Sequence, residues 1–351
     1  MRALVCEEFG QVVVRDVAEP SVQDPTDVVV RVTTTTVCGS DVGLVHGHIP
    51  TEPGFVLGHE YVGVVEEVGG AVSRVQPGQR VVGPAAPYCG TCATCARGQI
   101  QRCERGGVLG SGAPWGGHGG TQAERLRVPH ADRDLVPVPD GLSDEQVLFA
   151  GDILPTGWSA VRWADTTPGD TLVVLGAGPV GLAAVLTAKL HGPRAVIVVD
   201  PIEGRRQLAA TLGASLTLDP TRDDVAAAVA EHTRDGADGV VEAAGRADTI
   251  VQATQLVRVG GSVAIVGIPP GPVELPIADL LMRNITLRQG LGYLGDMDRL
   301  VALIAAGRLD ATPLITHRYA SDQLAEAFHT FEHQQDGIVK PAITMSQPPQ
   351  V

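Results

Sequence analysis

The chain has 351 residues, more than one hydrophobic core usually organises, so we expect two domains. Hydrophobic residues make up 44% and charged residues 19%, and the net charge of -14 argues against a nucleic-acid backbone or an anionic membrane as partner. No apolar run approaches the ~20 residues of a membrane span, and the first residues read as a strand rather than a signal peptide. We therefore expect a cytoplasmic protein.

The first 150 residues are rich in β-branched runs separated by turn signals, a pattern that is typical of strands. Such runs occur at 12–14, 28–32 and 61–65. Residues from about 84 to 120 lack this periodicity and hold four of the six cysteines. That segment must be held in place by something other than a hydrophobic core.

From residue 171 the pattern alternates between strands and helices. Apolar strand-like runs lie at 172–175, 195–199, 215–218, 238–243 and 262–266, with apolar helical stretches at 179–190 and 202–212. Strands that alternate with helices of this length indicate βαβ units and a parallel sheet, so the fold class is α/β. After about residue 290 the chain becomes mixed, with a helix near 296–306 and a strand near 338–344.

A glycine motif joins the first of these strands to its helix. The residues Gly176, Ala177, Gly178, Pro179, Val180 and Gly181 fit G-x-G-x-x-G, which follows a buried strand and opens a helix. Gly176 allows the tight turn, Gly178 lets the backbone approach a pyrophosphate, and Gly181 lets the helix pack closely. The helix N-terminus then offers free N–H groups to the phosphates, so we predict a dinucleotide site.

An acidic residue selects between the two nicotinamide dinucleotides. Asp200 stands at the end of the next strand, nineteen residues after Gly181, where it can accept hydrogen bonds from the adenosine ribose. A 2′-phosphate there would meet a like charge, which favours NAD over NADP. Two basic residues follow, Arg205 and Arg206, which could in principle hold the 2′-phosphate of NADP. We expect instead that Arg205 lines the adenosine pocket and that Arg206 is solvated.

The cysteine cluster predicts a structural metal site. Cys89, Cys92, Cys95 and Cys103 place four soft ligands on one loop, and zinc takes four thiolates tetrahedrally without needing secondary structure. A redox pair would need only two cysteines, and free thiols would need no such spacing. With no open coordination position, this zinc should not take part in catalysis. Cys6 lies apart in an apolar strand and is expected in the core.

Three further segments could carry chemistry. They are Cys38-Gly39-Ser40-Asp41, the stretch that begins Gly58-His59-Glu60, and Asp152. Taken singly, a cysteine is usually a core residue, a histidine is usually a satisfied polar residue, and an aspartate often caps a helix. Sequence spacing alone does not join them.

The complete chain resembles the zinc-containing alcohol dehydrogenases of the medium-chain dehydrogenase/reductase family. The segment G-H-E-x2-G-x5-G-x2-V from Gly58 to Val72 matches that family's zinc signature, and the cysteine lobe and the glycine motif follow in the family's order. The resemblance implies a GroES-like β-rich catalytic domain, formed by residues 1–153 and 290–351, with the structural zinc lobe at about 84–120. It implies a Rossmann NAD-binding domain at 154–289.

By this resemblance, Cys38, His59 and Asp152 hold a catalytic zinc, with Glu60 as an alternate ligand and Asp41 orienting His59. Two zinc ions per chain are therefore expected. The sequence departs from the family's best-known form, because Asp152 stands where those members have a second cysteine. The aspartate version is similar to bacterial secondary-alcohol and formaldehyde dehydrogenases.

The resemblance also implies roles for residues around the zinc. Zinc would lower the pKa of the alcohol, Ser40 would take its proton, and the nicotinamide would receive the hydride. Thr156 would lie close to the nicotinamide, and Lys340 would meet a pyrophosphate oxygen. Many members carry a relay histidine three residues after the serine, but this chain has Gly43 there. His46 or His48 could replace it, or protons could leave through ribose hydroxyls and water. The alternative for His46 is an exposed loop residue.

The expected activity is the reversible oxidation of a small primary or secondary alcohol to an aldehyde or ketone. The alternatives are a polyol, sugar or cyclitol dehydrogenase, a non-catalytic NAD-binding homologue, and a zinc-free quinone or enoyl reductase. Trp115, Trp158 and Leu291 are candidate walls of the substrate pocket. The resemblance further implies a homodimer or homotetramer formed through the nucleotide domain.

Overall fold

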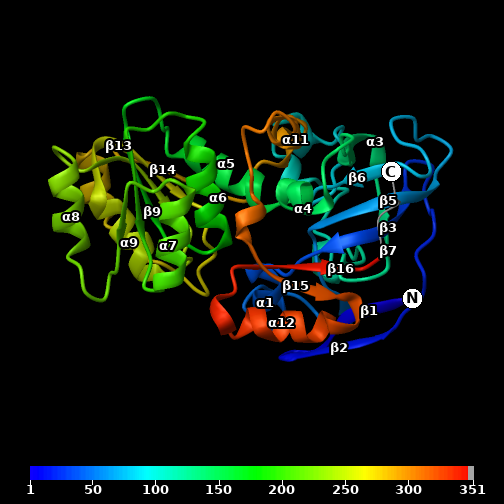
Figure 1. Ribbon diagram of the computed structural model, residues 1–351. Helices are drawn as coiled ribbons and strands as arrows, with labels where there is room; N and C mark the ends of the chain where they lie inside the picture. The colour runs from blue at the N-terminus through cyan, green and yellow to red at the C-terminus, as the bar shows by residue number, and fades with distance from the viewer. Residues whose placement is uncertain (347–351) are drawn as a thin grey trace. The chain divides into compact units, whose positions relative to one another are not determined.

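The computed structural model describes residues 1–346 and divides into two compact units (Figure 1). The catalytic unit consists of Met1–Asp152 and the chain from Tyr293 onwards, and the nucleotide unit is Ile153–Gly292. The sequence predicts these boundaries after residues 153 and 289. The observed boundaries differ from these predicted ones at both ends of the nucleotide unit. At the first boundary, helix α5 (Ile153–Trp163) packs along helix α6 (Pro179–Ala188). At the second, Gly292 lies so close to α5 that a Cβ on it would stand 2.6 Å from the Thr156 Cα.

The catalytic unit is built on two sheets. The larger has the order β15-β16-β3-β5-β6-β8, with β7 paired to β3, and the smaller has the order β2-β1-β4. Their strands are β1 (Arg2–Glu8), β2 (Gln11–Asp16), β3 (Val28–Thr35), β4 (Phe55–Val56), β5 (Tyr61–Val68), β6 (Arg80–Val82), β7 (Arg125–Val128), β8 (Val136–Pro137), β15 (Ile315–Ala320) and β16 (Lys340–Thr344). The C-terminal strand β16 runs antiparallel to β3. This pairing brings residues near 340 beside residues near 37, although about 300 positions separate them.

Short helices connect and cover these sheets. They are α1 (Gly39–Val45), α2 (Ala93–Ala96), α3 (Ala131–Asp134), α4 (Asp144–Val147), α11 (Met297–Ala305) and α12 (Leu324–Glu332). Alternate residues of the strands point into one core, to which Val28, Val30 and Val32 of β3 and Phe328 of α12 all belong. The β-rich expectation for this unit is confirmed.

The nucleotide unit contains one six-stranded sheet in the order β11-β10-β9-β12-β13-β14, and every pair in it is parallel. Its strands are β9 (Thr171–Leu175), β10 (Ala195–Val199), β11 (Leu216–Leu218), β12 (Ala237–Glu242), β13 (Val257–Ile265) and β14 (Thr286–Gln289). Besides α5 and α6, its helices are α7 (Glu203–Leu212), α8 (Val225–His232), α9 (Ala247–Leu256) and α10 (Ile277–Met282). This strand order is that of the doubly wound dinucleotide-binding fold, so the Rossmann expectation is confirmed.

The central strand β9 explains why the sequence analysis could recognise this sheet. All five of its residues are buried, as expected for a parallel strand with helices on both faces. Val173 and Leu175 pack with Val229 of α8 and Ile250 of α9, and the intervening residues point to the opposite face. Among residues 1–346, no helix is both long and apolar enough to cross a membrane.

Candidate active site and metal centres

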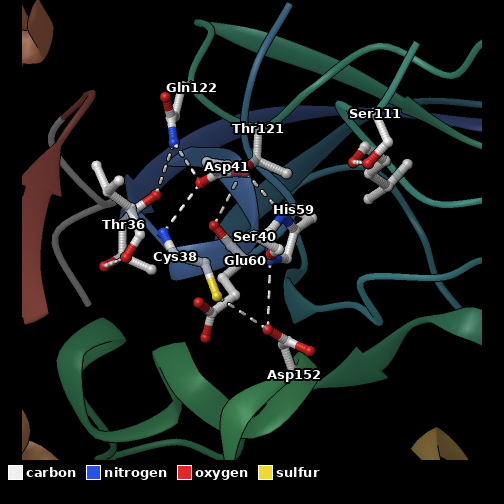
Figure 2. A network of polar contacts seen from close by, with 12 residues as sticks. Thr36, Cys38, Ser40, Asp41, His59, Glu60, Ser111, Thr121, Gln122 and Asp152 are labelled. Atoms are coloured by element: carbon white, nitrogen blue, oxygen red, sulfur yellow. Dashed lines mark hydrogen bonds and ion pairs between the residues drawn. The ribbon is translucent and has the colours of Figure 1, made fainter. Parts of the chain in front are cut away.

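Three segments of the catalytic unit supply the central polar cluster (Figure 2). Cys38 is the N-cap residue of α1, and its backbone N–H donates to the Oδ2 of Asp41 at 2.9 Å. His59 and Glu60 directly precede β5, and Asp152 follows the 3-10 turn Leu148–Gly151. The cluster therefore joins one helix start, one strand start and one helix end.

Gly58 is the residue that lets His59 enter this cluster. Its φ of +97° lies in the left-handed region that favours glycine, and a Cβ there would stand 2.6 Å from the Thr121 hydroxyl oxygen and 2.8 Å from the backbone nitrogen of Gln122. Any larger residue would push the segment away from the neighbouring chain. The glycine of the G-H-E motif is thus required by space as well as by backbone conformation.

The three proposed ligands converge on one point. The Cys38 Sγ lies 3.7 Å from the Asp152 Oδ2, and the same oxygen lies 3.3 Å from the His59 Nε2. A tetrahedral zinc ion with ordinary bond lengths would separate sulfur from oxygen by ~3.6 Å and nitrogen from oxygen by ~3.3 Å. Together with Glu60, all four ligand atoms lie within 4.8 Å of one another. The residues present therefore fit a zinc ion.

Buried partners fix the direction in which His59 points. Its Nδ1 lies 3.0 Å from the Asp41 Oδ1, which leaves the Nε2 directed at Cys38 and Asp152. The other oxygen of Asp41 accepts from the Gln122 side-chain amide at 3.0 Å. A histidine that binds a metal is typically held in this way, by a carboxylate on its other ring nitrogen.

The electrostatics of the cluster favour a cation. Burial opposes a charge on His59, but the carboxylates of Asp41 and Asp152 outweigh it and raise the pKa of His59 well above its ordinary value. Burial likewise opposes the Asp152 charge, but the hydrogen bond with His59 lowers the pKa of Asp152. A divalent ion would take over the neutralising role of the His59 proton, because a metal ligand must be an unprotonated imidazole.

Lys340 lies buried beside the metal cluster. Its side chain is fully buried, donates to the Val37 carbonyl oxygen at 2.8 Å, and forms an ion pair with the Oε1 of Glu60. The pairing of β16 with β3 puts it there. The expected contact of Lys340 with a pyrophosphate oxygen stays a prediction, because an ammonium has three N–H donors and these two partners use two of them. Burial raises the pKa of Glu60 to about 7, against the effect of the Lys340 ammonium. Its Oε2 is buried and has no hydrogen-bond partner, which fits the role of an alternate metal ligand.

Ser40 lies in the cluster, whereas a relay histidine does not. The Ser40 hydroxyl oxygen is 3.3 Å from the His59 Nε2. At Gly43 a Cβ would meet the side chain of Ile49 at 3.2 Å, so that isoleucine fills the place where a relay histidine would begin. His46 is turned to Glu332 of α12, with 2.7 Å between its Nε2 and the Glu332 Oε1. The structure favours the exposed-residue interpretation of His46.

The four cysteines of the lobe also converge. The Cys103 Sγ lies 3.5 Å from the Cys89 Sγ and 3.8 Å from the Cys92 Sγ, and Cys95 completes a set within 4.8 Å. A tetrahedral zinc–thiolate site has sulfur–sulfur separations of ~3.8 Å, so these residues fit a second zinc ion. Backbone N–H groups point at the sulfurs, among them that of Thr91 at 3.5 Å from the Cys89 Sγ. Although burial opposes it, these hydrogen bonds lower the pKa of Cys89 to about 5.

The glycine motif begins α6 in the nucleotide unit. Gly176 has a φ of +93°, a Cβ on Gly178 would meet open space, and a Cβ on Gly181 would overlap the carbonyl oxygen of Gly176. Gly178 is the N-cap of α6, and Pro179 occupies its first turn, where a missing N–H costs nothing. The open space beside Gly178 therefore lies at the N-terminus of α6.

Asp200 is tied to this loop, and Arg206 differs from its expected exposure. Asp200 is buried and accepts from the backbone N–H groups of Ala177 at 2.7 Å and Ile202 at 2.8 Å. Arg206 donates to the carbonyl oxygen of Asp200 at 2.7 Å and pairs with Asp219, so it is a structural residue rather than a solvated one. Arg205 is partly buried, and its burial lowers the pKa of its guanidinium.

The remaining predicted residues lie as follows. Thr156 belongs to α5 of the nucleotide unit. Trp158, on the same helix, is buried with its ring centroid 4.8 Å from that of His191, so it packs inside that unit. Trp115 belongs to the catalytic unit and donates to the carbonyl oxygen of Pro50 at 2.9 Å. Leu291 is partly exposed.

Three features together define a metal-dependent dehydrogenase. They are the parallel nucleotide-binding sheet, the lobe of four thiols, and the cluster of thiolate, imidazole and carboxylate groups. Comparison with known protein families agrees: the model for the alcohol dehydrogenase GroES-like domain matches residues 24–140, and that for the zinc-binding dehydrogenase matches residues 179–306. The chain belongs to the zinc-binding alcohol dehydrogenases of the medium-chain dehydrogenase/reductase family. It is an oxidoreductase of alcohols that uses zinc and a nicotinamide cofactor.

Individual relatives span the whole chain. An alcohol dehydrogenase of Cupriavidus necator is 34% identical over 362 residues, covering 98% of this chain and 98% of its own. The structure of the alcohol dehydrogenase from Thermus sp. ATN1 has a TM-score of 0.94 at 40% identity, covering 99% of this chain and 100% of that one. A zinc-binding dehydrogenase from Sinorhizobium meliloti, solved with NADP, has a TM-score of 0.88 at 31% identity and covers 98% and 99%.

Two features of the cluster escaped the sequence analysis. Gln122 holds Asp41 and also donates to the carbonyl oxygen of Thr36 at 3.1 Å, yet it stands in an ordinary loop sequence with no motif around it. The Glu60–Lys340 pair joins residues 280 positions apart. A buried lysine at the start of an apolar strand was the only available signal, because such a residue requires an acidic partner.

Proposed function

We propose that this chain oxidises a primary or secondary alcohol to an aldehyde or ketone, with NAD as the hydride acceptor, and that Cys38, His59 and Asp152 hold the catalytic zinc. The observation that best supports this assignment is the convergence of the Cys38 sulfur, the His59 nitrogen and the Asp152 oxygen at tetrahedral spacings. Their thiolate, neutral imidazole and carboxylate would balance the charge of a divalent ion. The aspartate-containing ligand set is itself part of the proposal.

When bound, zinc lowers the pKa of an alcohol, and the nicotinamide ring accepts a hydride. Asp41 holds the ring of His59 with its Nε2 towards the cluster, so that geometry is set before substrate arrives. The Ser40 hydroxyl lies beside that nitrogen and is the group on this chain placed to accept the proton of the substrate hydroxyl while it passes its own proton outward, to a ribose hydroxyl of the cofactor or to water. Glu60 has one carboxylate oxygen free to approach the metal while Lys340 retains the other.

NAD rather than NADP is supported by Asp200, whose carboxylate lies at the end of β10 beside the glycine loop. The NADP in the Sinorhizobium meliloti structure is a property of that protein. Thr156 and Arg205 are proposed to contact the nicotinamide and the adenosine respectively. Asp200→Asn keeps an acceptor for one of the two backbone N–H groups and removes the charge that repels a 2′-phosphate.

We expect wild-type kcat/KM to be at least about tenfold higher with NAD⁺ than with NADP⁺, a preference of about 1.4 kcal/mol, and Asp200→Asn to narrow that ratio. The assay should use a panel of primary alcohols, secondary alcohols, diols and sugar alcohols at saturating zinc. Equal or faster turnover with NADP⁺ would overturn the cofactor assignment. Turnover of polyols alone would replace the simple-alcohol proposal by a polyol dehydrogenase.

We further propose a homo-oligomer that forms through the nucleotide unit. Strand β14 is an edge of the six-stranded sheet, and the neighbouring helix α10 exposes Ile277, Leu281 and Met282 at 63%, 70% and 77%. An apolar surface next to an unpaired strand edge is typical of a subunit interface. Light scattering of the purified protein should give a dimer or tetramer mass, and a monomer at micromolar concentration would refute this part.

A cytoplasmic location is also proposed. All six cysteines are free thiols, and four of them form a metal cluster, a use of cysteine that suits a reducing compartment.

A further inference from the structure

A third group of metal-ligating side chains lies at the C-terminal end of α12, away from both zinc clusters. His329 and Glu332 belong to the last turn of α12, and His333 is its C-cap. One ligand atom from each of the three lies within 4.8 Å of the others. Their sequence, His-Thr-Phe-Glu-His, places two histidines at positions i and i+4, which stand on the same face of a helix.

A fourth side chain reaches the same carboxylate from another element. The Glu332 Oε1 lies 2.7 Å from the Nε2 of His46, the C-cap of α1. The Glu332 Oε2 lies 3.1 Å from the Nδ1 of His329 and 3.5 Å from that of His333. Three imidazoles thus surround one carboxylate whose side chain is only 12% exposed, while the histidines remain 40–59% exposed and accessible to an ion.

The backbone under these groups is well anchored. The buried residues Leu324, Ala327 and Phe328 fix α12 to the core of the catalytic unit, so the ligands stand on a packed helix rather than a free loop. The Nδ1 of His333, 3.5 Å from the Glu332 Oε2, also lies 2.9 Å from the carbonyl oxygen of His329, so an ion bound through this nitrogen would replace that contact. The carbonyl end of a helix also favours a positive charge.

From this convergence we infer a third metal site, formed by His329, Glu332 and His333 with His46 as a further ligand, that binds a divalent transition metal such as Zn²⁺ or Ni²⁺. Imidazole and carboxylate ligands suit these ions, whereas Ca²⁺ and Mg²⁺ prefer all-oxygen sites. The exposure of the histidines makes this an exchangeable site rather than a buried structural one.

The site would connect α12 with α1, the helix whose N-terminal end carries part of the catalytic cluster. His46 ends α1, whose first residues Ser40 and Asp41 and whose N-cap Cys38 form part of the catalytic cluster. Glu332 already joins α12 to α1 through His46. An ion bound here replaces one hydrogen bond by shared coordination and ties the far end of α1 to α12.

The test is calorimetric titration of the zinc-loaded enzyme, prepared without a polyhistidine tag, with NiCl₂ at about pH 7.5, where free imidazole is mostly neutral. We expect one further Ni²⁺ per chain, with no zinc released to a chromophoric indicator. His333→Gln and Glu332→Gln should each weaken that binding at least about tenfold, a loss that even outer-shell changes commonly produce. His46→Gln should also weaken it.

The matched control is His232→Gln. His232 also ends a helix and also places its Nδ1 2.9 Å from the carbonyl oxygen four residues earlier, but it stands in the nucleotide unit outside any ligand group found among residues 1–346. This variant should bind nickel like the wild type. The inference is overturned if the zinc-loaded enzyme binds no Ni²⁺ in addition to its two zinc ions, or if nickel uptake releases an equal amount of zinc. Unchanged nickel affinity in His333→Gln would also overturn it.

Discussion

Asp152→Ala is expected to lower kcat by at least about 10³-fold, which corresponds to about 4 kcal/mol of lost transition-state stabilisation. The reason is that Asp152 is the one carboxylate within 3.3 Å of the His59 Nε2 and 3.7 Å of the Cys38 Sγ, so its removal opens the cluster. Affinity for NAD should stay near normal, because the glycine motif lies in the nucleotide unit. Steady-state kinetics and the binding of NADH followed by fluorescence would measure the two effects separately.

The matched control for this variant is Asp140→Ala, which removes an exposed carboxylate from the same unit. It should keep wild-type turnover and both zinc ions, whereas Asp152→Ala should retain about one zinc, in the cysteine lobe. Turnover above about a tenth of the wild-type value in Asp152→Ala would show that the ligand assignment is wrong.

Lys340→Met is expected to destabilise the catalytic unit by about 3–5 kcal/mol, because it leaves the fully buried Glu60 without its cation. The pKa of Glu60 is already raised to about 7 by burial, and loss of the ammonium, which opposes that rise, would raise it further. At pH 6 the variant can keep Glu60 protonated, so the loss is smaller there and grows as the pH rises towards 8.5. Thermal unfolding should be measured after removal of the catalytic zinc, so that no metal ion replaces the lost ammonium beside Glu60. It should show a drop in Tm on the order of 10 °C at pH 8.5.

Two further variants distinguish the loss of the ion pair from a nonspecific loss of stability. Lys189→Met removes an exposed lysine and should leave the Tm unchanged. The double variant Glu60→Gln/Lys340→Met removes both charges and should recover part of the lost stability. A Lys340→Met protein as stable as the wild type at pH 8.5 would rule out the buried pair as a stabilising element.

The parts of the fold and site that the sequence revealed are those encoded locally. The strand β9 is a continuous apolar run followed at once by Gly176 and the start of α6, so strand, turn and helix are all written within about fifteen residues. The cysteine lobe is likewise a short loop in which four ligands need no partner elsewhere. In such segments, the residues that determine the local structure lie close together in the sequence, so their spacing alone allows a prediction.

The parts that could not be predicted from local sequence depend on long-range pairing. The contact of Lys340 with Glu60 could not be predicted locally, because it depends on the register of β16 against β3. Arg206 was expected in solvent, but a chain turn brings Asp219 to it. The gathering of Cys38, His59 and Asp152 could be inferred only from resemblance, because no local periodicity links positions so far apart.

The measurement that tests the central claim most directly is the anomalous scattering of crystals of the zinc-loaded enzyme at the zinc absorption edge. We predict one peak among the four cysteine sulfurs and a second within about 2.0–2.3 Å of the Cys38 Sγ, the His59 Nε2 and an Asp152 carboxylate oxygen. A map with full density for these three side chains but no peak between them would contradict the assignment.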